Sequence, residues 1–215
     1  LGANGIVGAS VPLALGSALA HQTRKTGGVA VAFFGDGAMA EGALHEALNM
    51  AALWSLPMVF ACENNGWSEF SPTARQFKGT LTGLAATFGI AHRSVDGNDV
   101  EATALAARDA VAHARSEGPF VLECLTTRVR GHYEGDAQKY RSDEERKALE
   151  ARDPIAIASA KLRAAGVAQE VIDEMAEKAG KSVADAVAAA LGDALPDFEA
   201  ALADVYTRAG PEHAR

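Results

Sequence analysis

The stretch of sequence that decides the fold is Val29 to Trp67, which reads VAVAFFGDGAMAEGALHEALNMAALWSLPMVFACENNGW. It begins with a short apolar run, Val29 to Phe34, which has glycine on both sides and is typical of a buried strand in a parallel sheet. Apolar residues then recur with helical spacing from Ala40 to Ala51, and a second apolar run, Met58 to Cys62, follows Pro57. The stretch therefore predicts a strand, a helix and a second strand.

Polar residues follow both of these predicted strands. Asp36 stands between two glycines after the first strand, and Asn64 and Asn65 follow the second. In an open α/β sheet, ligands bind at the carboxyl ends of the strands, so we expect these side chains to form a ligand site. A carboxylate, an amide oxygen and backbone carbonyls are hard donors that suit Mg²⁺ when phosphate oxygens fill its other positions. Either motif alone also fits an ordinary turn, and their combination favours the site.

These motifs resemble those of a known family. The GDG motif followed by Asn-Asn is similar to the thiamine-diphosphate signature. The flanking words GANGIVGA, LHEALNMAALW and CENN resemble the alpha subunits of the thiamine-dependent component of 2-oxo acid and acetoin dehydrogenase complexes. The resemblance runs to the end of the chain, and it implies that thiamine diphosphate and Mg²⁺ are the cofactors.

The resemblance also implies which residues hold the cofactors. The side chains of Asp36 and Asn65 and the backbone carbonyl of Trp67 would bind Mg²⁺. The family usually has an aromatic residue at this position, as this chain does with Trp67, and a ligand from the backbone does not depend on which side chain is present. Four further residues would lie beside the cofactor. Gly37 and Ala38 would lie against the diphosphate, and Gly5 and Val7 would lie near the aminopyrimidine.

A charged segment without apolar periodicity, Thr126 to Arg146, follows the last predicted strand. Its residues fit either a solvated loop that opens into a helix or, because it starts at a strand end, a segment whose arginines and His132 reach an anionic cofactor. In the family that the chain resembles, this segment lines the active-site entrance and its histidine contacts the cofactor diphosphate. The resemblance therefore implies that His132 is the catalytic and diphosphate-binding histidine. Pyruvate members have a second histidine where this chain has Arg130, and a serine-containing loop in place of Tyr133 to Asp136. These differences favour the acetoin members.

The rest of the first part of the chain repeats the alternation of strands and helices. One helix is expected to begin near Ala9 to Val11, and Gly66 to Lys78 reads as a polar loop. Asp96 and Asn98 stand at a strand end, where they can contact a ligand or only form a turn and cap. The remaining elements are predicted to be a helix, a strand, a helix and a strand, at Thr80–Phe88, Ile90–Val95, Val100–Arg115 and Phe120–Leu125. This order predicts an α/β, doubly wound, mainly parallel sheet.

The last part of the chain is rich in alanine and predicts helices. We expect an α/β domain over residues 1–150, which the resemblance identifies as the thiamine-diphosphate-binding fold, and a C-terminal helical extension over residues 151–215. In this extension, Gly166 separates two helices and Pro196 opens a short third one. Because these helices carry few large apolar residues, we expect them to face a partner or to cap the domain.

Composition limits the remaining possibilities. The 215 residues are 48% hydrophobic, enough for one sizeable core. There are 28 acidic and 20 basic residues with no basic block, which argues against nucleic acid, and no apolar run is long enough for a membrane span. We expect Cys62 and Cys124 to be reduced core residues. No signal peptide is visible, so we expect a cytoplasmic protein. The resemblance implies that the chain is the C-terminal two-thirds of a longer subunit, whose missing part would carry any targeting segment.

The resemblance implies an oxidoreductase subunit. The expected substrate is acetoin, with pyruvate as the alternative, and the acyl group would pass to a lipoyl group. The implied partners are this small-molecule substrate, a beta subunit in an alpha2beta2 heterotetramer and a lipoyl acyltransferase. The beta chain would supply the activating glutamate, so neither Glu41 nor Glu46 is assigned that role. A non-catalytic assembly subunit, which Asp36 and Asn65 argue against, stays open, whereas a nucleotide-binding protein needs a lysine phosphate loop that this sequence lacks.

Overall fold

The computed structural model describes residues 5–195 and 197–198, and it divides the chain after Lys161 into two compact units. The strands are β1 (Ala30–Gly35), β2 (Met58–Asn64), β3 (Trp67–Ser68), β4 (Ser71–Pro72), β5 (Ala91–Asp96) and β6 (Phe120–Leu125). The α-helices are α1 (Ser10–Arg24), α2 (Gly42–Leu53), α3 (Leu81–Thr87), α4 (Val100–Ser116), α5 (Asp143–Glu150), α6 (Pro154–Ala164) and α7 (Gln169–Gly192). Two short 3₁₀ helices are η1 (Asp36–Ala40) and η2 (Thr73–Arg75).

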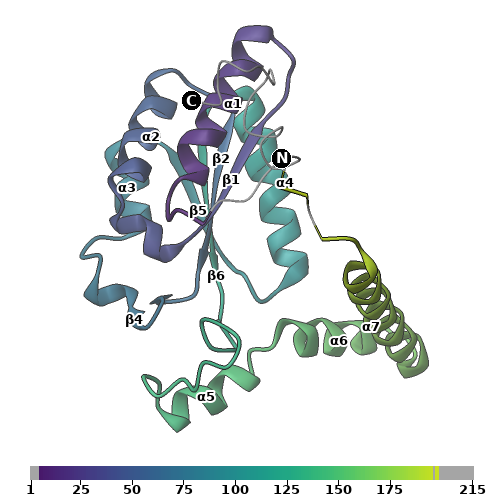
Figure 1. Ribbon diagram of the computed structural model, residues 1–215. Coiled ribbons are helices and arrows are strands. Elements are labelled where there is room, and N and C mark those ends of the chain that lie inside the picture. Colours follow the sequence, from purple (N-terminus) through teal and green to yellow (C-terminus); the bar gives the residue numbers. More distant parts are fainter. Residues whose placement is uncertain (1–4, 196, 199–215) are drawn as a thin grey trace. The chain divides into compact units, whose positions relative to one another are not determined.

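The first unit contains a four-stranded sheet in which all strands run parallel, in the order β1-β2-β6-β5 (Figure 1). The register aligns the carboxyl ends of the strands, since Gly35 pairs with Glu63, and Leu125 pairs with both Asn64 and Asp96. All residues that follow these four strands therefore start from one edge of the sheet. The predicted parallel sheet is confirmed.

Helices cover both faces of this sheet, which makes it doubly wound, as predicted. On one face, Phe34 and Phe60 are buried in a core with Leu44 and Leu48 of α2, to which α1 and α3 also contribute. On the other face, Leu122 packs in a smaller core with three alanines of α4, namely Ala106, Ala110 and Ala114. These alanines recur every fourth residue, so they form one helix face that lies close to the sheet.

Two segments differ from the sequence-based expectation. The stretch from Gly66 to Lys78 is not a plain loop, because it holds the β3–β4 hairpin and η2. The backbone N–H of Thr73 donates to the carbonyl of Gly66 at 3.0 Å and closes this segment onto the end of β2. The prediction was wrong because two-residue strands have no detectable alternation of polar and apolar residues. Strand β2 also continues past Cys62 to Asn64.

The segment after β6 and the helices behind it agree with the predicted order of elements. The backbone turns at Gly166, where φ is +87°, between α6 and α7. The predicted extension begins at residue 151, and the structure links its first residues to the first unit through Arg152 to Asp96 at 2.8 Å and Lys161 to Asp99 at 2.6 Å. The helix predicted from Pro196 lies outside the described residues.

Two further expectations concern cysteines and membranes. Cys62 is buried and Cys124 is partly buried, and both are free thiols, as predicted. Burial raises the pKa of the Cys62 thiol above its usual range. None of the described helices has both the length and the apolar character needed to cross a membrane.

Candidate functional site

The centre of the candidate site is Asp36, which directly follows β1 and is 1% exposed. Its Oδ1 accepts a hydrogen bond from the backbone N–H of Asn65 at 3.1 Å, and its Oδ2 accepts one from the hydroxyl of Thr73. Asn65 directly follows β2, which lies next to β1 in the sheet. The structure therefore brings Asp36 into contact with the backbone of Asn65, two residues that the sequence places after separate strands.

The turn from Asn65 to Trp67 has a defined conformation of its own. The Oδ1 of Asn65 accepts a hydrogen bond from the backbone N–H of Trp67 at 3.0 Å, and Trp67 opens the β3–β4 hairpin. The predicted metal ligands, Asp36, Asn65 and the Trp67 carbonyl, are all hard oxygen donors, and their joint role at a metal stays a prediction. Among the described residues, no cluster of three or more histidine, cysteine, aspartate or glutamate side chains can hold a metal. A thiolate or imidazole metal centre is therefore absent from the described part of the chain.

Glycine at position 37 is required by the close approach of η1 to this turn. A Cβ atom on Gly37 would lie 2.5 Å from the Oγ and 3.0 Å from the Cβ of Ser68. Any larger residue would therefore push β3 away from Asp36. Ala38 is buried in the core, and its role beside the diphosphate stays a prediction.

The segment that contains Gly5 and Val7 lies before α1, and both residues are exposed. The hydroxyl of Ser10 donates to the carbonyl of Phe33 at 2.9 Å, which attaches the start of α1 to β1. The structure thus places this segment near the edge of the sheet that carries Asp36. The role of Gly5 and Val7 at the aminopyrimidine stays a prediction.

The start of the loop after β6 is held by a buried asparagine. Asn98 is fully buried, its Oδ1 accepts from the hydroxyl of Thr126 at 2.7 Å, and its Nδ2 donates to the hydroxyl of Thr127 at 3.1 Å. Asp99 accepts from the backbone of Ala102 and caps α4. Asp96 and Asn98 were expected either to contact a ligand or only to form a turn and cap, and the structure supports the turn and cap.

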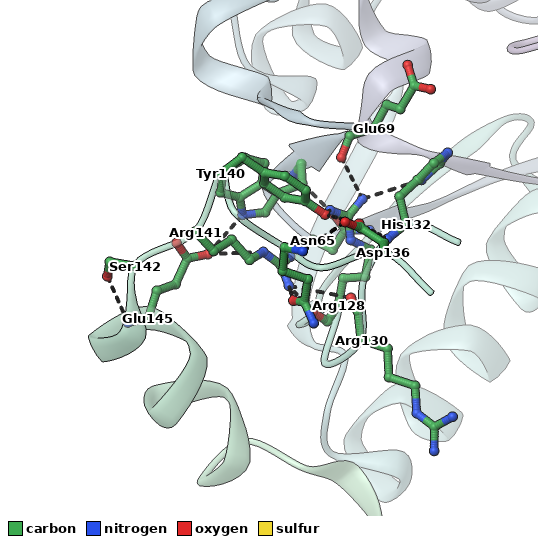
Figure 2. Close-up of polar contacts among 12 residues, drawn as sticks. Asn65, Glu69, Arg128, Arg130, His132, Asp136, Tyr140, Arg141, Ser142 and Glu145 are labelled. Atoms are coloured by element: carbon green, nitrogen blue, oxygen red, sulfur yellow. Dashed lines mark hydrogen bonds and ion pairs between the residues drawn. The ribbon is translucent and has the colours of Figure 1, made fainter. Parts of the chain in front are cut away.

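Farther along, the same loop is organised by a hydrogen-bonded chain of side chains (Figure 2). Arg128 donates to the carbonyl of Glu69 and to the hydroxyl of Tyr140, each at 2.9 Å. Tyr140 in turn donates to Oδ2 of Asp136 at 2.6 Å, which also accepts the backbone N–H of His132 at 2.8 Å. The hydrogen bond from Tyr140 is the main cause that lowers the pKa of Asp136 below its usual range.

His132 itself is exposed, and its Nδ1 lies 3.5 Å from Nη1 of Arg128. These two side chains present positive or protonatable groups on the same side of the loop, whereas Arg130 is exposed and points away from the other labelled side chains in Figure 2. Of the three basic candidates after β6, the structure therefore brings two together and leaves Arg130 apart.

Arg141 is a residue that sequence reasoning missed. Its side chain is 1% exposed and donates to the carbonyl of Arg128 at 2.8 Å and to Oε1 of Gln138 at 3.0 Å. The guanidinium lies 5.1 Å from the ring of Trp67, and burial lowers its pKa below the usual range. Arg141 thus joins the loop to the turn that carries Asn65. No local signal marks this arginine, because its partners are 13, 3 and 74 positions away in the sequence.

Comparison with known proteins gives a consistent result. The family model of the dehydrogenase E1 component matches residues 1–199. The alpha subunit of acetoin:2,6-dichlorophenolindophenol oxidoreductase is 40% identical in Bacillus subtilis, covering 96% of this chain and 62% of the relative, and 40% identical in Cupriavidus necator, covering 96% and 63%. The pyruvate dehydrogenase E1 component subunit alpha of Rhizobium meliloti is 43% identical, covering 96% and 59%. The chain thus spans about three fifths of the length of these relatives.

Proposed function

The chain belongs to the dehydrogenase E1 component family, and we propose that it acts as the alpha subunit of a thiamine-diphosphate-dependent dehydrogenase. The observation that carries this proposal is the contact between Asp36 and the Asn65 turn at the ends of two parallel strands. The family match alone would also fit an assembly subunit without catalysis. The buried carboxylate of Asp36 argues against that alternative. Burying a carboxylate is unfavourable, and a subunit that served only assembly would not need one at the position of a metal ligand.

We propose that Mg²⁺ is held by the side chains of Asp36 and Asn65 and by the Trp67 carbonyl. The donor set fits this ion, because three protein oxygens leave coordination positions for diphosphate oxygens. Asp36 already receives one N–H and one O–H donor, which hold its two oxygens in fixed positions. When bound, thiamine diphosphate supplies the group that accepts the electron pair of the bond that breaks in the substrate.

We assign the binding of the diphosphate to Gly37 and Ala38 on one side and to the loop after β6 on the other. Arg128 and His132 lie side by side, and the buried Nε of Arg128 has no hydrogen-bond partner among the described residues. An anion near this pair would provide that partner. His132 is the residue that we place against the cofactor as a catalytic group.

The remaining parts of the proposal concern partners and location. We propose a beta subunit that completes an alpha2beta2 heterotetramer and a lipoyl acyltransferase that accepts the acyl group. Glu41 and Glu46 are both exposed, and the activating glutamate is assigned to the beta subunit. The cytoplasmic location stays a prediction.

We propose acetoin as the substrate. Two relatives of this chain, in Bacillus subtilis and Cupriavidus necator, are named for acetoin. The resemblance places Arg130 where pyruvate members have a histidine. Pyruvate is the alternative, supported by the 43% identity to the Rhizobium meliloti protein. Acidic side chains of the loop after β6 can also disfavour an anionic substrate, but only weakly here. Asp136 accepts three hydrogen bonds inside the loop, so Glu134 is the exposed acid among residues 126–141.

The test replaces the acid in the complete alpha subunit, assembled with its beta partner. Asp36→Ala should abolish Mg²⁺-dependent binding of thiamine diphosphate in calorimetry, because it removes the only charged metal ligand. Asp96→Ala is the matched control, since Asp96 also ends a strand at this edge but pairs with Arg152, and it should bind normally. Unchanged affinity in Asp36→Ala would contradict the assignment of the metal site.

A further inference from the structure

A buried carboxylate beside the candidate site has no role in the function proposed above. Glu123 lies on the central strand β6 and is 7% exposed. Its Oε1 accepts from Nδ2 of Asn64 at 2.8 Å, its Oε2 accepts from the hydroxyl of Ser94 at 2.8 Å, and Nε2 of His92 lies 3.2 Å from the same Oε2. These partners come from β2 on one side and β5 on the other. The carboxylate is therefore fixed in place from both neighbouring strands.

Asn64 connects this carboxylate to the turn that carries the metal ligands. Its Nδ2 faces Glu123, and its Oδ1 accepts the backbone N–H of Gly66 at 3.2 Å. An asparagine amide can point either way, and only one orientation offers its oxygen to Gly66. Oε1 of Glu123 accepts from the NH₂ end of the amide, so this contact favours the orientation in which Oδ1 faces Gly66.

Close packing does not fix the orientation of Asn64. A cavity of about 380 Å³ lies beside the two side chains, and Asn64, Thr73 and Glu123 all line it. In a tightly packed interior, neighbouring atoms would hold an amide group in one rotamer. Here two hydrogen bonds distinguish the ends of the amide, one from its Nδ2 to Glu123 and one to its Oδ1 from the backbone of Gly66.

We propose that Glu123 is a positioning residue for the Mg²⁺ turn, acting through Asn64. By fixing the Asn64 amide, it holds Gly66 in the conformation that places Asn65 and the Trp67 carbonyl next to Asp36. Glu123 does not touch the metal. This inference rests on the proposed function, in which Asp36, Asn65 and Trp67 hold Mg²⁺.

The test measures metal binding directly in the complete alpha subunit assembled with its beta partner. Mn²⁺ replaces Mg²⁺, and its dissociation constant is measured by electron paramagnetic resonance in the presence of thiamine diphosphate. Glu123→Met removes the acceptor and should weaken Mn²⁺ binding about tenfold, the usual effect of losing a group that orients a metal ligand. Glu123→Gln keeps an oxygen that can accept from Asn64 and should restore binding to within about threefold of the unchanged protein.

A double substitution tests whether Glu123 acts through Asn64. Asn64→Ala alone should weaken Mn²⁺ binding about as much as Glu123→Met, because both variants break the same path. The double variant should bind no more weakly than Asn64→Ala alone, whereas independent effects would multiply. Multiplied effects would overturn the proposed path.

Matched controls separate this role from general damage to the fold. Ser94→Ala removes a donor from the other oxygen of Glu123 and leaves the Asn64 contact in place, so Mn²⁺ affinity should not change. If Glu123→Met does not assemble, Asn64→Ala decides the question, and wild-type affinity in that variant overturns the inference. Failure of the unchanged protein to bind Mn²⁺ with thiamine diphosphate would instead refute the proposed function. Normal binding in both the unchanged protein and Glu123→Met would refute only the role of Glu123.

Discussion

The two halves of the candidate site are held in place by different means. The metal turn, residues 64–67, begins with the last residue of β2. Asp36 of η1 accepts the backbone N–H of Asn65, and the backbone N–H of Thr73 in η2 donates to the carbonyl of Gly66. The cofactor loop, residues 126–141, contains no helix or strand and is held by its own side chains, chiefly Arg128, Asp136 and Arg141. The first half depends on strand register, whereas the second depends on side chains that must find one another. Substitutions in the cofactor loop should therefore have local effects, whereas the effects of substitutions in the metal turn should extend into the sheet.

The largest stability effect is expected at Arg141, because its buried charge connects the two halves. Arg141→Met keeps most of the volume but removes the donors to the Arg128 carbonyl and Gln138. Removing one member of a buried charged network typically costs about 3 kcal/mol. Amide hydrogen exchange should show the whole cofactor loop losing protection, while β1 and β2 keep theirs. Retained protection in the loop would mean that Arg128 and Asp136 hold it without Arg141.

A smaller effect is expected in the metal turn at Thr73. Thr73→Val has the same shape but leaves the buried Asp36 with one donor in place of two. The free energy of unfolding should fall by about 1.5 kcal/mol in urea denaturation, the usual cost of an unsatisfied buried acceptor. Thr103→Val is the control, because its hydroxyl makes only an exposed contact with the carbonyl of Asp96. Equal losses in the two variants would show that burial of Asp36 is not what makes Thr73 important.

Acidification should destabilise the cofactor loop and not the metal turn, with a smaller effect than the two substitutions above. The pKa of Asp136 is lowered in the folded loop, so its carboxylate stabilises the loop fully above the ordinary aspartate pKa of about 4. That contribution is lost as the pH falls through the lowered pKa. Exchange protection at His132 and Gln138, corrected for intrinsic rates, should therefore drop in acid. In Asp136→Asn the drop should disappear, and an identical drop in that variant would assign the effect to another group.

The smallest effect is expected for substrate choice. Glu134 is the exposed acid of the loop, and Glu134→Gln should raise the catalytic efficiency on pyruvate relative to acetoin by about twofold at low salt, because exposed charges act weakly on an anion. At physiological salt the difference should shrink. The assay uses the reconstituted alpha and beta subunits with an artificial electron acceptor. In the unchanged protein we expect higher efficiency on acetoin, and a clear preference for pyruvate at both salt concentrations would contradict the acetoin proposal.

The contrast between the halves also explains how much the sequence could predict. The parallel sheet, its helices and the meeting of Asp36 with Asn65 follow from apolar runs and from the rule that parallel strands end at one edge. Thr73 and Arg141 were not predicted, because a threonine and an arginine in polar segments read as solvated residues. Their burial depends on partners distant in the sequence, including Asp36 for Thr73 and Trp67 for Arg141.

The strand order has a consequence for synthesis of the protein on the ribosome. Strand β6 lies between β2 and β5, so these two earlier strands share no hydrogen bonds with each other in the sheet. The growing chain can pair β1 with β2 early, but it cannot join β5 to them until Phe120–Leu125 has left the exit tunnel. Glu123 lies on β6 and the cofactor loop follows this strand. Both therefore leave the ribosome only when β6 can complete the sheet. A nascent chain that stalls before this point exposes the unpaired edge of β2. An unpaired strand edge promotes aggregation, so chaperones would have to cover it.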